Sequence, residues 1–264
     1  MHDMTESTHK AYAEQHRAAA EQGDIAAQLS LANALLYVPS ADDIAEGIAL
    51  LRTLAEQDCP EGRYAQGLLG SIYGGVPSRY LQSTAPSLKL MPAPDYHEAL
   101  KWYRRLAGTG SAQAMAWIGE LYERGTPATP QDFGGALQWY TKAAASKDGE
   151  GYAFDVAEMH FHGRGVKQDY AEAARLYRKV LRHGGRAMLR LGWMHENGKG
   201  MPQDLAEAHA FFNLAREMGF GEKIEAEGNA GLLRVESAMT AEQRADGWRR
   251  YEEIKDVLTA LARE

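Results

Sequence analysis

Cysteine is almost absent from this 264-residue chain, with Cys59 as its single copy. One thiol excludes a disulfide framework within the chain, and it excludes a zinc site built from several thiolates. Cys59 directly precedes Pro60, a position where we expect a small, packed residue. The sequence must therefore stabilise its fold by burying apolar side chains.

Long apolar runs and a basic charge balance are also missing. No stretch of about eighteen apolar residues occurs, so the sequence predicts no membrane insertion. The formal net charge of −7 disfavours nucleic acid and anionic membranes as partners, because both require clustered Lys and Arg. The N-terminal stretch is polar and has no apolar core of an export signal. We expect a cytoplasmic protein as written, or a periplasmic one if a leader peptide has been removed.

Complete catalytic motifs are missing as well. Ser7 and Lys10 have the Ser-x-x-Lys spacing of β-lactamases, but no Ser-Asp-Asn or Lys-Thr-Gly sequence follows. There is no Gly-x-Ser-x-Gly motif and no phosphate-binding loop of the G-x-x-x-x-G-K-[ST] type. We predict that the chain is not an enzyme and needs no cofactor. A hydrolase or penicillin-binding activity is the least favoured alternative.

What the sequence does contain is an internal repeat. Residues 154–180 and 189–215 are two copies of one pattern, in which Gly163, Gly165, Asp169, Ala173 and Tyr177 correspond to Gly198, Gly200, Asp204, Ala208 and Phe212. A constant interval in the mid-thirties is typical of arrays of helix pairs. More divergent copies begin near residues 24, 59 and 111. In the first of them a stripe with helical spacing is formed by Ala27, Leu31, Ala32 and Leu35.

The repeated residues have structural explanations. Gly163 and Gly165 suit a tight turn that needs unusual φ values. Asp169 and Asp204 precede helical runs, where a carboxylate can cap free backbone N–H groups. Small residues allow the helices to approach closely, and paired aromatics are expected to wedge between neighbouring repeats, namely Trp102, Tyr103, Trp139 and Tyr140.

The segments outside the array are expected to cap it. We predict a capping helix in residues 1–23, a repeat array in residues 24–219 with an irregular insertion at 75–94, and capping helices in residues 220–264. Gly228 and Gly231 should weaken the first C-terminal helix. Thr240 and Gln243 form a capping-box pattern before the last helix. One face of that helix is predicted to hold Trp248, Tyr251, Ile254 and Leu258.

The pattern resembles the Sel1-like repeat family, a relative of the tetratricopeptide repeat. The resemblance is carried best by the stretches HGRGVKQDYAEAARLY and NGKGMPQDLAEAHAFF. It implies an all-α, right-handed α/α superhelical solenoid of about five repeats. It also implies a non-catalytic adaptor that binds a protein or peptide partner in a concave groove. The alternative within the same class is an immunity or inhibitor protein that neutralises a bacterial toxin.

Partner-binding residues are sought at positions that vary between repeats, because the repeated ones maintain the stack. On the first helices these candidates are Trp117, Glu120, Asp155, Glu158, Arg190 and Trp193. Such a groove would suit a basic or mixed peptide. The insertion adds Tyr80, Leu88 and Met91. The alternatives are an ordinary surface with packed tryptophans, and an insertion that only packs on its own repeat.

Two histidines occupy equivalent positions in the closest copies. His160 and His195 stand where other copies have an aromatic residue. A metal pair assisted by Glu158 is one interpretation. Imidazoles that replace packed aromatics are the favoured interpretation, so we predict no metal site.

Overall fold

The computed structural model describes residues 6–75, 89–127, 129–219 and 221–261. Within these ranges the regular structure is α-helical or 3₁₀-helical, apart from one isolated bridge between Thr126 and Thr129. None of the described helices is long and apolar enough to cross a membrane. The chain forms two compact units, Met1–Gln131 and Asp132–Glu264. The all-α prediction is confirmed.

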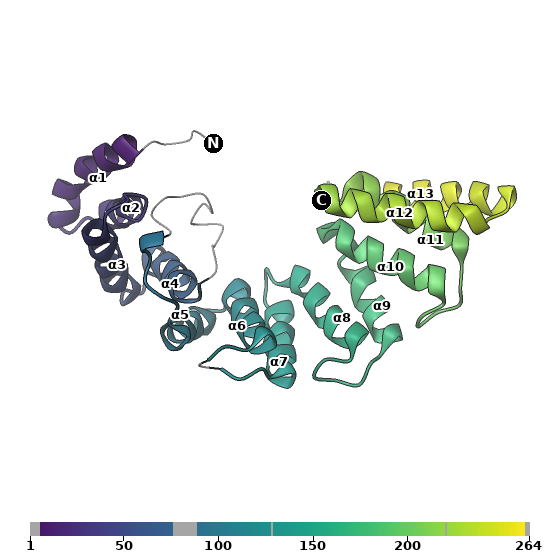
Figure 1. Ribbon diagram of the computed structural model, residues 1–264, viewed down its shortest axis with the longest axis horizontal. Coiled ribbons are helices and arrows are strands. Elements are labelled where there is room, and N and C mark those ends of the chain that lie inside the picture. Colours follow the sequence, from purple (N-terminus) through teal and green to yellow (C-terminus); the bar gives the residue numbers. More distant parts are fainter. Residues whose placement is uncertain (1–5, 76–88, 128, 220, 262–264) are drawn as a thin grey trace. The chain divides into compact units, whose positions relative to one another are not determined.

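The first unit is a series of helices in which each packs on the next along the chain (Figure 1). Its elements are α1 (Glu6–Glu21), α2 (Ile25–Leu35), α3 (Ala41–Ala55), α4 (Pro60–Tyr73), α5 (Tyr96–Gly108) and α6 (Ala112–Arg124). Helix α3 begins at Ala41 because Ser40 caps it by accepting a hydrogen bond from the backbone N–H of Asp43.

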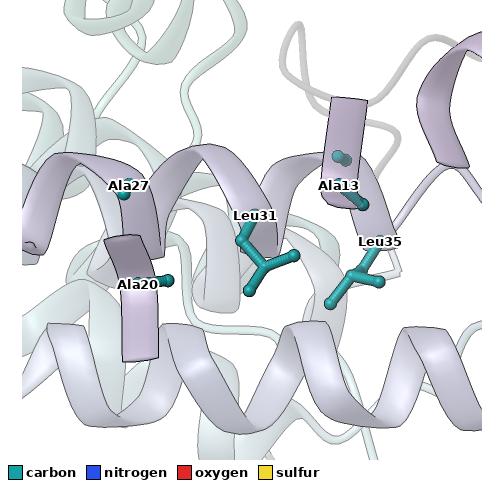
Figure 2. Close-up of a cluster of buried hydrophobic side chains, with 6 residues drawn as sticks. Ala13, Ala20, Ala27, Leu31 and Leu35 are labelled. Carbon is teal, nitrogen blue, oxygen red and sulfur yellow. The ribbon is translucent and has the colours of Figure 1, made fainter. Parts of the chain in front are cut away.

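Ala27, Leu31 and Leu35 of the predicted apolar stripe are buried against α1, and Ala32 is buried outside this cluster. Figure 2 shows Leu31 and Leu35 of α2 beside alanines from both helices. Ala13 and Ala20 of α1 are small enough to let the helices approach closely, and both are buried. The N-terminal helix thus covers the apolar face that the first repeat would otherwise expose.

The second unit contains the two closest copies of the repeat and the C-terminal helices (Figure 1). Its elements are α7 (Phe133–Ala145), η2 (Glu150–Tyr152), α8 (Ala153–His162), α9 (Tyr170–Lys179), η3 (Leu181–His183), α10 (Gly185–Asn197), α11 (Leu205–Met218), α12 (Glu222–Ala238) and α13 (Ala241–Leu261). Consecutive helices from α7 to α12 pack on one another, and α11 also packs on α13.

The two glycines of each repeat turn have different roles. Gly163 ends α8 in the left-handed conformation, with φ 67° and ψ 35°. Gly165 also has a positive φ, and a Cβ there would lie 2.3 Å from the carbonyl oxygen of Phe133 on α7. Gly200 repeats the arrangement, since its Cβ would lie 2.6 Å from the carbonyl carbon of Tyr170 on α9. The second glycine therefore brings each turn against the backbone of the preceding repeat.

A Gln-Asp pair closes each turn from both sides. Gln168 donates its side-chain amide to the carbonyl of Phe161 at 2.9 Å, which satisfies a free acceptor at the end of α8. The next residue, Asp169, accepts the backbone N–H of Glu172 and caps α9. Gln203 and Asp204 make the same two kinds of bond in the next copy. The aspartate caps were predicted from the sequence, and the glutamine bonds were not.

Tyr103 packs both inside its own helix pair and against the next repeat, and only the second of these contacts was predicted. Tyr103 of α5 is buried against Gly70 of α4, where a Cβ would lie 2.2 Å from the tyrosine ring. The ring of Tyr103 also contacts that of Trp117 on α6, with centroids 4.9 Å apart. In the second unit Tyr177 is fully buried, whereas Trp139 is only half-buried.

The glycines of α12 turn out to serve packing. A Cβ at Gly231 would lie 2.6 Å from the ring of Phe212 on α11, and one at Gly228 would lie 3.1 Å from the Phe212 carbonyl oxygen. Only residues without a side chain allow α12 to lie this close to α11. The expectation that these glycines simply weaken the helix was therefore incomplete.

The last helix is anchored on α11. Thr240 and Gln243 exchange the two bonds of the predicted capping box, at 2.9 and 3.2 Å. His209 of α11 is fully buried and is contacted edge to face by the Trp248 ring. Burial lowers the pKa of His209, and this outweighs the nearby carboxylate of Glu236, which raises it. Trp248 itself is 43% exposed, so it lies at the margin of the face on which Tyr251 and Leu258 are buried.

Candidate functional site

One face of α8 is joined to one face of α10 by three side-chain contacts at helical spacing. The guanidinium of Arg186 lies 4.2 Å from the ring centroid of Phe154. One turn further, Glu158 pairs with Arg190. A turn beyond that, the rings of Phe161 and Trp193 meet edge to face, 5.3 Å apart. Residues i, i+4 and i+7 of both helices therefore face each other.

The central contact is a bidentate ion pair. Arg190 donates Nε and Nη2 to the two carboxylate oxygens of Glu158 at 2.7 and 2.8 Å, and the hydroxyl of Tyr177 donates to the same carboxylate. Burial acts to raise the pKa of Glu158, but the bonds from Arg190 and Tyr177 outweigh it and leave the pKa lowered. Burial and the negative charge of Glu158 together raise the pKa of Tyr177. Glu158 is therefore ionised and already bound within the unit.

Two adjoining cavities lie beside this contact and extend to α12. The first, of about 530 Å³, lies between the start of α8, η3 and the start of α10, and Asp155 and His183 line it. The second, of about 460 Å³, lies between α10 and α12, and Arg190 and Trp193 line it. Both cavities share the side chains of Phe154, Arg186 and Ile224.

We call this region the α8/α10/α12 face. It is defined by residues 154, 155, 158 and 161 of α8, residues 186, 189, 190 and 193 of α10, and residues 223, 224, 227, 230 and 234 of α12. Residues 223, 227, 230 and 234 recur at i, i+4, i+7 and i+11, so α12 also presents one face. The region is concave and mixes aromatic with charged groups, as binding sites commonly do.

The structure brings together the predicted residues of the second unit. Asp155, Glu158, Arg190 and Trp193 all belong to the α8/α10/α12 face. Glu158 contributes through Arg190, because its carboxylate is occupied by that side chain. The sequence therefore located this part of the face without showing how its charges are paired.

The remaining predicted residues belong to the first unit or lie outside the described residues. Trp117 is half-buried against Tyr103, while Glu120 is exposed on α6. Met91 is half-buried ahead of α5. Tyr80 and Leu88 lie outside the described residues.

His195 has the environment expected for a packed imidazole, whereas His160 is only half-buried. His195 is 8% exposed and stacks on the ring of Phe211, with centroids 5.7 Å apart. Burial lowers its pKa, which favours the neutral ring. Nδ1 of His195 and Nδ1 of His160 are buried and make no hydrogen bond with any described residue. Within the described ranges, no three His, Cys, Asp or Glu side chains are grouped so that they could hold a metal ion.

The contribution of α12 to this face was not predicted from the sequence. Lys223, Glu227, Ala230 and Arg234 line the second cavity, although this helix was assigned only a capping role. Their helical spacing was visible in the sequence. The position of the helix was not, because it depends on contact through Gly231, outside the repeat pattern.

The fold and this face define an α-helical repeat protein built from helix pairs. The Sel1 repeat pattern matches residues 89–108, 112–148, 152–184 and 185–220. The chain belongs to the Sel1 repeat family. Sel1 repeats are in general protein-interaction modules and are typically non-catalytic.

Solved structures with the same kind of fold are similar to this chain. A Sel1 repeat protein from Oxalobacter formigenes is 23% identical, with a TM-score of 0.56 over 73% of this chain and 72% of that chain. The protein c5321, a protective antigen of uropathogenic Escherichia coli strains with an SLR fold, is 22% identical, with a TM-score of 0.46 over 91% of this chain and 55% of that one. The chain thus spans about half the length of c5321. No curated protein matches the sequence.

Proposed function

We propose that the chain is a non-catalytic adaptor that captures a protein or peptide partner on the α8/α10/α12 face. The observation that carries this proposal is the pair of adjoining cavities, which together place Phe154, Trp193 and Ile224 within reach of one ligand. Aromatic and Arg side chains in concave sites supply much of the binding energy in protein interfaces.

The surrounding contacts support a preformed site. Phe154 and Trp193 are held by cation–π and edge-to-face contacts within the unit, so they lose little freedom on binding. Glu158 is occupied by its bonds to Arg190 and Tyr177, which argues for a positioning role for this carboxylate and against acid–base chemistry.

A matched pair of substitutions on α12 tests the proposal. Ala230 lines the second cavity, while its neighbour Asn229 is exposed and does not line it. Ala230→Trp should fill the cavity, and Asn229→Trp places the same side chain about 100° away around the helix. Both original side chains are uncharged, so neither substitution changes the net charge. Both positions are exposed, so far-UV circular dichroism should match the wild type for both variants.

The assay is affinity capture from an extract of the source cells, followed by mass spectrometry. Proteins captured by the wild type should be retained by Asn229→Trp and lost by Ala230→Trp. Equal capture by both variants would show that the partner binds elsewhere. The identity of the captured protein also distinguishes an adaptor from an inhibitor, because an inhibitor should recover a toxin.

A further inference from the structure

The cavity between α10 and α12 is lined by more cationic than anionic groups, although two of its arginines are paired with carboxylates outside its lining. Arg186, Arg190, Lys223 and Arg234 line it, and Glu227 is the one carboxylate among its lining residues. Apolar side chains from all three helices and from α11 complete the lining, among them Leu189, Trp193 and Phe212. The cavity thus combines positive charge with an apolar surface.

The arginines are held in place by aromatic rings. The guanidinium of Arg186 lies over Phe154, and that of Arg234 lies 5.8 Å from the centroid of Phe212. The guanidinium of Arg190 lies 5.0 Å from the centroid of the Phe161 ring. These contacts restrict the position of each guanidinium before a ligand arrives.

Donor groups remain available for a ligand. Arg234 uses Nε and Nη2 to bind Glu196, so its Nη1 donates no hydrogen bond to any described residue, whereas Arg190 is engaged by both Glu158 and Tyr177. Arg186 and Lys223 form no ion pair with the residues that the structure describes. Carboxylates are the protein groups best matched to such donors.

We propose that this cavity binds an acidic peptide segment, with a carboxylate held by Arg186 and its neighbours and an adjacent apolar side chain packed against Trp193 and Leu189. This inference rests on the proposed function and specifies the chemistry of the partner. It differs from the basic or mixed peptide expected from the sequence, because Glu158, which suggested a basic ligand, is neutralised by Arg190.

A nucleic acid is the competing anion, and two observations disfavour it. The chain has a net charge of −7, and the cations gather in one cavity of about 460 Å³. A protein that binds nucleic acid needs a continuous basic surface that follows the phosphate backbone. A single-stranded oligonucleotide therefore serves as a competitor in the test.

Fluorescence anisotropy on the full chain tests this inference. The probe is a labelled peptide of alternating glutamate and leucine, compared with counterparts that carry glutamine or lysine in place of glutamate. Arg186→Gln removes the exposed cation that borders both cavities. Arg175→Gln is its matched control, because Arg175 is an exposed arginine on α9 that pairs only with Glu172 of its own helix among the described residues.

The glutamate peptide should bind, and its affinity should fall with salt. Arg186→Gln should weaken it about tenfold, the loss expected for one charge-assisted hydrogen bond, while Arg175→Gln should leave it unchanged. The inference would be overturned if the glutamine or lysine peptide bound equally well or more tightly, if Arg186→Gln had no effect, or if no peptide bound. It would also be overturned if oligothymidylate displaced the probe at a lower concentration than unlabelled peptide does.

The Ala230→Trp variant separates the two proposals. If a lysine or glutamine peptide binds and Ala230→Trp abolishes that binding, the face is a recognition site and only the carboxylate preference is wrong. If peptide binding is unaffected by Ala230→Trp, the proposed face itself fails.

Discussion

Replacing Gly165 with alanine tests how the repeats are joined. Gly165 has φ 69°, and a Cβ there would lie 2.3 Å from the carbonyl oxygen of Phe133 and 2.8 Å from the backbone nitrogen of Gly134. Both atoms belong to the backbone of the preceding helix pair, so no side-chain rotation can relieve the contact. Gly198 is the matched control, since it has nearly the same φ of 63° but its nearest neighbour would be 3.4 Å from a Cβ.

The two substitutions share the conformational cost and differ in the steric one. An alanine in the left-handed conformation costs about 1–2 kcal/mol relative to glycine. Alanine also lowers the conformational entropy of the unfolded chain, which offsets about 0.4–1 kcal/mol of this cost. Gly198→Ala should therefore destabilise the protein by about 1 kcal/mol. Gly165→Ala adds an overpacking cost of about 1–3 kcal/mol, for a total of about 2–4 kcal/mol.

Urea denaturation followed by far-UV circular dichroism measures the difference. Because repeat proteins do not always unfold in one step, the loss should be read from the transition that carries the second unit. Gly165→Ala should lower that transition clearly more than Gly198→Ala does. Equal losses would show that the turn does not contact the preceding helix as described, and the stacking argument would fail.

Three further predictions concern the second unit and its control. Gly231→Ala should destabilise the protein by about 1–3 kcal/mol, because the new methyl group collides with the ring of Phe212. Gly108→Ala, in a helix with open space around that position, should stabilise it by up to about 1 kcal/mol. Thermal melts that rank the two variants the other way would contradict the packing of α12. A double-mutant cycle with Glu158→Gln and Arg190→Gln, measured by urea denaturation, should give a coupling energy of about 1–2 kcal/mol. This value lies between those of exposed and buried ion pairs, because the side chains of Glu158 and Arg190 are 18% and 37% exposed. A coupling energy near zero would refute the link between α8 and α10. Burial lowers the pKa of His209 from 6.5, so the contribution of the neutral ring to stability is complete above pH 6.5 and is lost as the pH falls below that value. His209→Gln should therefore flatten the decline of the melting temperature on the acid side. An unchanged slope would contradict the lowered pKa of His209.

The repeat framework could be predicted because it depends on contacts close in sequence. Gly163 and Asp169 end one helix and begin the next within a single turn, and their roles follow from backbone geometry. Tyr103 and its partner Gly70 recur in the pattern as an aromatic and a small residue. Local chemistry and periodicity were sufficient for these elements.

The α8/α10/α12 face could be predicted only in part, because its contacts depend on register between helices. Repeat alignment makes Glu158 equivalent to Trp193, yet Glu158 contacts Arg190 and Phe161 contacts Trp193. The contacts are thus displaced by about one helical turn from the equivalent positions. Neither this displacement nor the neutralisation of Glu158 can be obtained from one sequence. The contribution of α12 to this face was not predicted, because Gly231 was considered only for its helix propensity.

Photo-crosslinking from α12 tests the central claim most directly. A small aliphatic amino acid with a diazirine group, which unlike tryptophan leaves the cavity open, should crosslink to the partner in the source cells when placed at Ala230, while the same group at Asn229 should not. The predicted result is a band of higher mass that forms with the group at position 230 and is clearly weakened by Arg186→Gln. Equal crosslinking from both positions, or crosslinking from Asn229 alone, would contradict recognition on the α8/α10/α12 face.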